Sequence, residues 1–141
     1  MPNELMTSLS YISTARAGLT EEDFRDILSE ANDRNDRLGL TGLLAFNGLN
    51  FMQVLEGPRR NVHQCIGMIE ADRRHDGMVI YDRREIRRRE FPDWQMVGVM
   101  VDQTGQNSKA DLDAILAGEA VLPQTRKHFE SFHSFGKPAA N

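Results

Sequence analysis

The chain has little cysteine and no long apolar run, and each absence removes a class of protein. Its 141 residues include a single cysteine, Cys65, so no internal disulfide can form. Cys65 lies in an apolar-periodic segment without cysteine or histidine at ligand spacing, which favours core packing over a redox role. No apolar stretch is long enough to cross a bilayer, and no cationic leader is present. We therefore expect a cytoplasmic protein without a membrane partner.

Charge and catalytic motifs are equally sparse. A formal net charge of −4 gives no reason to expect nucleic acid as the main partner. The basic run at residues 83–89 is interleaved with acid and lacks aromatic residues on which bases could stack, so a solvated hairpin that protects a sheet edge is favoured. There is no nucleophile–base motif and no glycine-rich phosphate loop. We expect no metal, because metal-ligand spacing is absent around the four histidines, His63, His75, His128 and His133.

Apolar periodicity and turn residues predict five strands and two long helices around one core. Thr20, followed by three acids, predicts the start of the first helix, which we expect to end near Arg34 or Asn35. The dipeptide Asn47-Gly48 predicts a tight antiparallel hairpin. The second helix follows Gly57-Pro58 and is expected to stop near the cluster Asp72-Arg73-Arg74-His75-Asp76-Gly77, where the glycine ends the pattern. Its apolar stripe comprises Val62, Cys65, Ile66, Ile69 and Met68, and the expected strands are Glu4–Ile12, Leu40–Asn47, Leu49–Glu56, Met78–Ile86 and Trp94–Val101.

This element order predicts an α+β fold of the ferredoxin-like β-α-β-β-α-β-β plan. Both helices then lie on one face of a mixed sheet, with the first and third strands as central neighbours. We expect residues 1–101 to form this domain and residues 102–141 a C-terminal extension of two short helices. Ser108 with Asp111 predicts the start of one helix and Pro123 the start of the other. The extension would cover the bare face of the sheet or, with Phe129, Phe132 and Phe135 exposed, would form a dimer contact.

One amide side chain stands in an otherwise apolar strand. Alternation places Gln53 on the same face as Phe51 and Leu55. A buried glutamine without partners costs on the order of 1–3 kcal/mol, so a polar side chain or a ligand should meet Gln53 there. The alternative is a core glutamine bonded to a backbone carbonyl.

Three polar side chains are expected to face the same groove between the two helices. They are Tyr11 near the end of the first strand, Asn35 at the end of the first helix, and Gln53. Such a set suits a flat heterocycle with an apolar body and one edge of donors and acceptors. Alternatively, the three are a core aromatic, a helix C-cap and a satisfied core amide. The groove walls would be Ile27, Leu28, Ile66 and Ile69.

A small basic cluster follows the second helix. Guanidinium groups bind phosphate in a bidentate manner, so Arg73, Arg74 and His75 could hold an anion. A charged helix end that complements the helix dipole is the favoured interpretation of the cluster taken alone.

The joint pattern resembles the BLUF domain, a family of blue-light sensors that use flavin adenine dinucleotide. The resemblance covers about residues 4–101, and its motifs occur in the family order and at the family spacing. They are Leu9-Ser10-Tyr11-Ile12-Ser13, Asn35-Asp36-Arg37-Leu38-Gly39-Leu40-Thr41-Gly42, Phe51-Met52-Gln53-Val54-Leu55-Glu56-Gly57, Asp72-Arg73-Arg74-His75 and Phe91-Pro92-Asp93-Trp94-Gln95-Met96.

The resemblance implies a role for each matching residue. Tyr11 matches the tyrosine that gives an electron and then a proton to the excited flavin, and Gln53 matches the glutamine whose hydrogen bonds then rearrange. Asn35 matches the asparagine that holds the pyrimidine edge of the ring. The cofactor implied is FAD, with FMN or riboflavin as substitutes. Other matching positions are Arg34 near the ring, Arg74 and His75 near the ribityl and phosphate part, and Trp94 and Met96 on the last strand near the glutamine.

The same resemblance implies a sensory module without enzymatic turnover. About forty residues follow the sensor core, too few for an effector domain, so we expect a short stand-alone member that signals to a separate protein or through self-association as a homo-oligomer. Two alternatives stay open at this point. One is an acylphosphatase-type enzyme in which Asn35 and an arginine bind a phosphoryl group. The other is a light-insensitive ligand-binding module with the same fold.

Overall fold

A computed structural model describes residues 5–92, 97–100 and 112–132. The order of its elements confirms the predicted β-α-β-β-α-β-β plan, and a C-terminal helix begins at Pro123 as predicted. Residues 112–116 are also helical. The elements are β1 (Met6–Ala15), α1 (Glu21–Leu38), β2 (Thr41–Phe46), β3 (Asn50–Pro58), α2 (Arg59–Glu70), β4 (His75–Ile86), β5 (Val97–Met100) and α4 (Pro123–Phe132).

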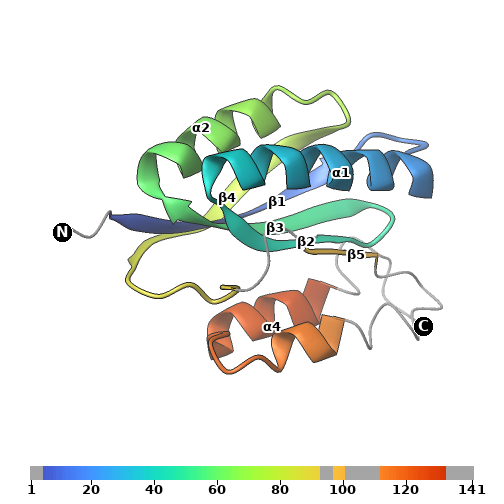
Figure 1. The fold of residues 1–141 in the computed structure, drawn as a ribbon. Coiled ribbons are helices and arrows are strands. Elements are labelled where there is room, and N and C mark those ends of the chain that lie inside the picture. The colour runs from blue at the N-terminus through green and yellow to red at the C-terminus, as the bar shows by residue number, and fades with distance from the viewer. Residues whose placement is uncertain (1–4, 93–96, 101–111, 133–141) are drawn as a thin grey trace.

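The five described strands form one mixed sheet in the order β4-β1-β3-β2-β5. β1 is antiparallel to both β3 and β4, and β2 is antiparallel to β3 but parallel to β5. The predicted central pairing of the first and third strands is therefore confirmed. Figure 1 shows α1 and α2 together on one face of this sheet and α4 on the opposite face. The two faces of the sheet are thus covered by different helices.

Helix α1 begins as predicted and ends one turn later. The Thr20 hydroxyl accepts a hydrogen bond from the Asp23 N–H, and the Asp23 carboxylate accepts one from the Thr20 N–H, which completes a capping box. The helix continues past Arg34 and Asn35 to Leu38 because its stop is Gly39, which adopts the left-handed conformation at φ 67°. The predicted end was wrong because polar residues do not by themselves end a helix, whereas a left-handed glycine does.

The turn at Asn47-Gly48 is present, although both strands are shorter there than predicted. Asn47 Oδ1 accepts hydrogen bonds from the N–H groups of Leu49 and Asn50, so this side chain satisfies amides that would otherwise pair across the hairpin. Gly42 explains why β2 and β3 can approach closely. A Cβ atom at that position would lie 1.9 Å from the Val54 carbonyl oxygen, so only glycine fits.

Helix α2 and strand β4 differ in three respects from the prediction. The helix ends at Glu70 with Ala71 as its C-cap in a right-handed conformation, so Gly77 does not stop it and lies instead inside β4. Strand β4 begins at His75, three residues before the predicted start. Met68 is 48% exposed and does not belong to the buried stripe, which consists of Val62, Cys65, Ile66 and Ile69.

The sheet separates two apolar cores. Between the sheet and the helices α1 and α2, Leu9, Phe24 and Leu55 belong to a cluster in which the rings of Phe24 and Phe46 stack at 5.4 Å. On the other face, side chains of β2 and β3 pack against the C-terminal helices; this second cluster includes Leu43, Met52, Val54, Leu112, Leu116, Phe129 and Phe132. The C-terminal residues 112–132 therefore cover the sheet face that the two long helices leave bare.

Some expectations fall outside the described residues. These are the side chains of Trp94 and Met96, the capping pair Ser108 and Asp111, and Phe135. The division of the chain at residue 101 stays a prediction for the same reason. The described part of the last strand is Val97–Met100, which lies within the predicted range.

Candidate functional site

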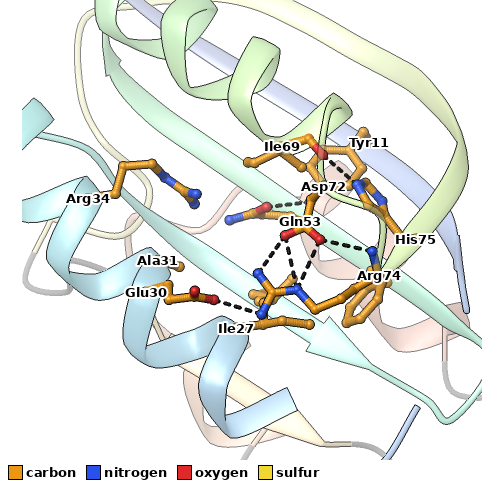
Figure 2. Close-up of a pocket in the computed structure, with 12 residues that line it drawn as sticks. Tyr11, Ile27, Glu30, Ala31, Arg34, Gln53, Ile69, Asp72, Arg74 and His75 are labelled. Carbon is orange, nitrogen blue, oxygen red and sulfur yellow. Dashed lines mark hydrogen bonds and ion pairs between the residues drawn. The ribbon is translucent and has the colours of Figure 1, made fainter. Parts of the chain in front are cut away.

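A pocket lies between α1, the α2–β4 connection and the centre of the sheet, as Figure 2 shows. Strands β1, β2 and β3 supply its floor, α1 supplies one wall, and the end of α2 with the start of β4 supplies the other. Its lining residues are Tyr11, Ile27, Glu30, Ala31, Arg34, Leu44, Phe51, Gln53, Ile69, Asp72, Arg74 and His75. Seven of these were predicted from the sequence as candidate site residues, namely Tyr11, Ile27, Arg34, Gln53, Ile69, Arg74 and His75.

Tyr11 and Gln53 form a buried pair at the floor of the pocket. They are direct partners in the β1–β3 register, and the Tyr11 hydroxyl donates a hydrogen bond of 2.5 Å to Gln53 Oε1. Their exposed fractions are 3% and 2%. The polar group expected beside Gln53 is therefore the phenol of Tyr11. The register between β1 and β4 shifts on both sides of Tyr11 and Ile12, and such irregularities re-aim the side chains near them.

Burial keeps the phenol of Tyr11 protonated. Removal from water raises the pKa of Tyr11 well above its ordinary value of 10.0, and the nearby Cys65 raises it further. The hydroxyl group is thus a permanent hydrogen-bond donor over the ordinary pH range. A donor fixed in this way gives the Tyr11–Gln53 contact a defined direction, from phenol to amide oxygen.

Asn35 is buried next to the pocket without lining it. Its exposed fraction is 0%, and its Nδ2 has no hydrogen-bond partner among the described residues. Its Oδ1 accepts only long contacts, 3.5 Å from Arg34 Nε and 3.6 Å from Cys65 Sγ. An unpaired buried amide is costly, so this donor is a site at which a ligand acceptor would be stabilised.

Cys65 and Ile66 form the layer of α2 behind the pocket. Both are buried in the core cluster on this face of the sheet, and neither lines the pocket. Burial raises the pKa of the Cys65 thiol, which agrees with the expectation that it packs in the core.

The guanidinium of Arg74 bridges the two walls of the pocket. It binds Asp72 through Nε at 2.9 Å and Nη2 at 2.6 Å, and it reaches Glu30 of α1 through Nη1 at 2.7 Å. These hydrogen bonds lower the pKa of Asp72 below its usual range. Arg74 is therefore held by carboxylates of the chain itself, at the position where the sequence analysis expected it near a phosphate.

His75 is held in place by both of its ring nitrogens. Its Nε2 lies 2.6 Å from the Ile69 carbonyl oxygen, so this nitrogen carries the proton and donates. Its Nδ1 lies 2.7 Å from Ser13 Oγ, which donates to it in that tautomer. The imidazole thus ties the end of α2 to β1 and contributes an apolar ring edge to the pocket, 6.2 Å from the ring of Phe51.

Several lining residues were not identified from the sequence, namely Glu30, Ala31, Leu44, Phe51 and Asp72. Two of them carried a readable signal. Ala31 lies between Ile27 and Arg34 at helical spacing, and Phe51 shares the strand face of Gln53. Asp72 opens the motif that contains Arg74 and His75, but only its contact with Arg74 reveals its place in the pocket wall. Glu30 had no signal, because its position depends on the way in which α1 passes the α2–β4 connection.

Metal clusters and membrane-spanning helices are not formed by the described residues. Within residues 5–92, 97–100 and 112–132, no group of three or more His, Cys, Asp or Glu side chains could hold a metal ion. In the same part of the chain, no helix has both the length and the apolar character needed to cross a membrane.

Comparisons with known proteins agree on one family. The sequence profile of the BLUF family, sensors of blue-light using FAD, matches residues 6–97. The dark-state structure of the BLUF protein BlrB is 34% identical with a TM-score of 0.70, and the match covers 91% of this chain and 98% of BlrB.

Two curated relatives are much longer proteins. The photoactivated adenylate cyclase subunit beta of Euglena longa is 30% identical over 132 residues, which is 92% of this chain and 14% of that protein. The blue light- and temperature-regulated antirepressor BluF of Escherichia coli K12 is 37% identical over 75 residues, 53% of this chain and 19% of that protein. The chain therefore spans only a minor part of either relative.

The fold and the pocket define a small α+β ligand-binding domain with a tyrosine–glutamine pair at the base of its site. The chain belongs to the BLUF family, whose members sense blue light with a flavin, and its cofactor is FAD. The residues present fit such a group: the pocket has apolar walls for a flat ring, and beside it lies the unpaired amide donor of Asn35.

Proposed function

We propose that this chain detects blue light through the Tyr11–Gln53 pair, with FAD bound non-covalently in the pocket between α1 and the α2–β4 connection. The observation that carries the proposal is the 2.5 Å hydrogen bond from the Tyr11 hydroxyl to Gln53 Oε1 at the pocket floor. The chain acts as a sensor without turnover of its own.

When bound, FAD supplies a light-excited electron acceptor. Tyr11 gives up one electron, and its hydroxyl proton leaves along the existing hydrogen bond toward Gln53 Oε1. The buried phenol does not ionise beforehand, because burial raises its pKa, so electron and proton leave it only after illumination.

Gln53 then changes its hydrogen bonds. The two ends of its carboxamide differ in chemistry and hardly in shape, so rotation or tautomerisation reverses donor and acceptor without creating a cavity. With a flavin bound, the rearranged Gln53 would offer it a new donor, which would shift its absorption slightly to the red. Because no covalent bond to the protein forms, the chain returns to its starting arrangement in the dark.

The remaining candidate residues bind and orient the cofactor. Ile27 and Ile69 provide apolar contact for the ring, with Ile66 packed behind them. The free Nδ2 of Asn35 donates to the ring edge, and Arg34 offers a cation at the pocket wall. Arg74 and His75 also line the pocket and would contact the ribityl and phosphate part of the cofactor, and FMN or riboflavin would use the same ring contacts.

The test is a visible spectrum in darkness, under blue light and after dark recovery, for the wild type and two tyrosine variants. Tyr11→Phe should bind flavin and lose the reversible red shift. Tyr81→Phe is the matched control, because Tyr81 packs on the opposite side of the sheet against His128 at 4.9 Å, and it should shift as the wild type does. A Tyr11→Phe protein that still shifts would refute the role of Tyr11.

The second part of the proposal concerns output. The signal leaves through β5 and the C-terminal helices to a separate protein or to a second copy of the chain. Support comes from the packing of residues 112–132 against β2 and β3, the strand that carries Gln53. Size-exclusion chromatography in darkness and in light, alone and with candidate partners, tests this part. An elution volume that is independent of light in every mixture would contradict it.

A further inference from the structure

Two buried carboxylates lie outside the pocket. Glu56 has an exposed fraction of 0% and Glu90 of 5%. Glu56 is on β3, three residues after Gln53, and its side chain shares the strand face of Met52 and Val54, which is the face covered by the C-terminal helices. A charge is kept in such a place only where hydrogen bonds replace the lost water.

Glu56 receives its hydrogen bonds from the segment that precedes β5. Its Oε1 accepts from the Phe91 N–H at 2.6 Å, and its Oε2 accepts from the Glu90 N–H at 3.0 Å. A longer contact of 3.4 Å comes from the Thr41 hydroxyl at the start of β2. The end of β3 is thereby fastened to residues 90 and 91.

The side chain of Glu90 continues this connection to the C-terminal helices. Its Oε1 accepts from the Leu122 N–H at 2.8 Å, one residue before α4 begins. Its Oε2 pairs with Arg84 at 3.1 Å, and the same Arg84 nitrogen lies 3.3 Å from the hydroxyl of Thr125 in α4. Glu90 thus binds the entry of α4 directly and is linked to its first turn through Arg84.

Arg89 adds the end of α1 to the same junction. Its guanidinium donates to the Gly39 carbonyl oxygen at the C-cap of α1 and to the Glu56 carbonyl oxygen, each at 2.9 Å. Residues 89–91, which we call the junction segment, therefore contact the helix that carries Arg34 and Asn35, the strand that carries Gln53, and the entry of α4. Figure 1 shows that α4 lies across the sheet from α1, so the junction segment links elements on opposite faces.

We propose that the junction segment is the connection through which β3 sets the position of α4, and that Glu56 and Glu90 are its positioning residues. The inference rests on the proposed function, because it names the residues that carry a change at Gln53 to the C-terminal helices. Apolar side chains of similar volume could pack in the same space. What the two carboxylates add is a set of hydrogen bonds with a fixed direction. Coupling between Gln53 and α4 is demonstrated only by perturbing the connection at its β3 end and at its α4 end.

The test compares Glu90→Gln with Glu85→Gln, an exposed carboxylate on β4 that serves as the matched control. Amide hydrogen exchange of α4 is followed in darkness and in blue light, with the flavin spectrum recorded on the same samples. Glutamine keeps the shape but places an N–H₂ group against Arg84 or Leu122. In darkness, α4 of Glu90→Gln should therefore exchange about ten- to a hundredfold faster than in the control, as expected for losing a hydrogen bond to a charged group.

Glu56→Gln tests the other half of the connection. This change disturbs the contact with residues 90 and 91 but leaves Leu122 and Thr125 with their partners, so a purely structural role in docking α4 predicts little change there. We expect its flavin to shift as in the wild type, while the light-minus-dark difference in α4 exchange disappears. If Glu56→Gln fails to bind flavin, Thr41→Val replaces it, because it removes the hydroxyl that Arg89 binds at 2.8 Å.

The outcomes separate this inference from the function on which it rests. Equal dark exchange in Glu90→Gln and Glu85→Gln would overturn the docking role, and this comparison needs no light. A wild-type protein that shifts red with unchanged α4 exchange, or a Glu56→Gln protein that keeps the light-minus-dark difference, would overturn the coupling alone. A wild-type protein that binds flavin and never shifts would overturn the proposed function and the coupling with it.

Discussion

The same strand, β3, contributes side chains to a pocket on one face of the sheet and to a close-packed apolar cluster on the other. Toward α1 and α2, β3 presents Gln53 to a pocket in which Tyr11 is its partner. Toward α4, the same strand presents Met52 and Val54 to a close-packed apolar cluster, with Glu56 at its edge. The face toward α1 and α2 contains a pocket with the unpaired amide donor of Asn35 beside it. The face toward α4 is packed with apolar side chains.

Particular buried polar groups beside the pocket and across the sheet differ in their hydrogen bonding. Beside the pocket, Asn35 Nδ2 has no partner among the described residues, although its position is fully buried. Across the sheet, each oxygen of Glu56 and Glu90 has a donor supplied by the chain. On that same face Ser8 Oγ and Arg84 Nε lack a hydrogen-bond partner among the described residues, so the contrast is between the two bonded carboxylates and the amide donor of Asn35. This contrast can be tested by substitutions on each side.

The largest effect on stability should come from the filled face. Phe129 has an exposed fraction of 0% and packs in the cluster beneath β2 and β3. Phe129→Ala should lower the free energy of unfolding by about 3–5 kcal/mol, because it removes a buried ring and leaves a cavity. Urea unfolding measures this loss, and Glu130→Ala on the exposed side of α4 is the control.

The folded fraction of Phe129→Ala should still bind flavin and shift red, because the pocket lies on the other face. An unfolding curve equal to that of Glu130→Ala would mean that α4 does not close the sheet in solution. Loss of flavin binding in protein that remains folded would mean that the two faces are not independent.

The pocket face should show the opposite behaviour, a loss of binding with little loss of stability. Asn35→Leu keeps the approximate shape and removes an amide whose contacts within the chain are long or absent. We expect about a tenfold weaker flavin affinity, the net value of roughly one hydrogen bond, with about 1 kcal/mol or less lost from the free energy of unfolding of the flavin-free protein. Flavin fluorescence titration and urea unfolding give the two values.

Asn32→Leu is the control for this substitution, because Asn32 is on the same helix and does not line the pocket. An affinity for flavin that is unchanged in Asn35→Leu would remove Asn35 from the binding site. A large loss of stability in the flavin-free protein would instead identify it as a structural core amide.

The sequence predicts the filled face and the Tyr11–Gln53 pair well, since both follow from local periodicity. Strand alternation places Gln53 opposite Met52, and helical spacing identifies Phe129 and Phe132 as one face of α4. The pair requires in addition that the first and third strands be neighbours, which the order of the elements predicts.

The errors lie where a contact distant in sequence or a single backbone angle decides the structure. The end of α1 depends on the positive φ of Gly39, and the end of α2 needs no glycine at all. Arg74 meets Glu30, forty-four residues earlier, only because α1 passes the α2–β4 connection. The junction segment was likewise not predicted: it begins at the last residue of the basic run 83–89, of which Arg84 and Arg89 are engaged internally. Local sequence patterns do not predict contacts between residues that are so far apart in the chain.

The smallest expected effect concerns the ion pairs that join the pocket walls, and it should depend on pH. Hydrogen bonds from Arg74 lower the pKa of Asp72 in the folded state, so the folded protein releases this proton more readily than the unfolded chain does. The contribution to stability is therefore present above the unfolded pKa of about 3.9 and is lost as pH falls through the folded pKa. Because both side chains are 27% exposed, we expect about 1 kcal/mol or less.

Asp72→Asn isolates this contribution, with Asp76→Asn on the exposed side of β4 as its control. The difference in unfolding free energy between the wild type and Asp72→Asn should be constant from about pH 5 to 7 and should shrink toward zero below about pH 4, as the carboxylate is protonated. Added salt should reduce it further, because exposed ion pairs are screened. A difference that instead grows as pH falls would show that Asp72 is destabilising in the folded state.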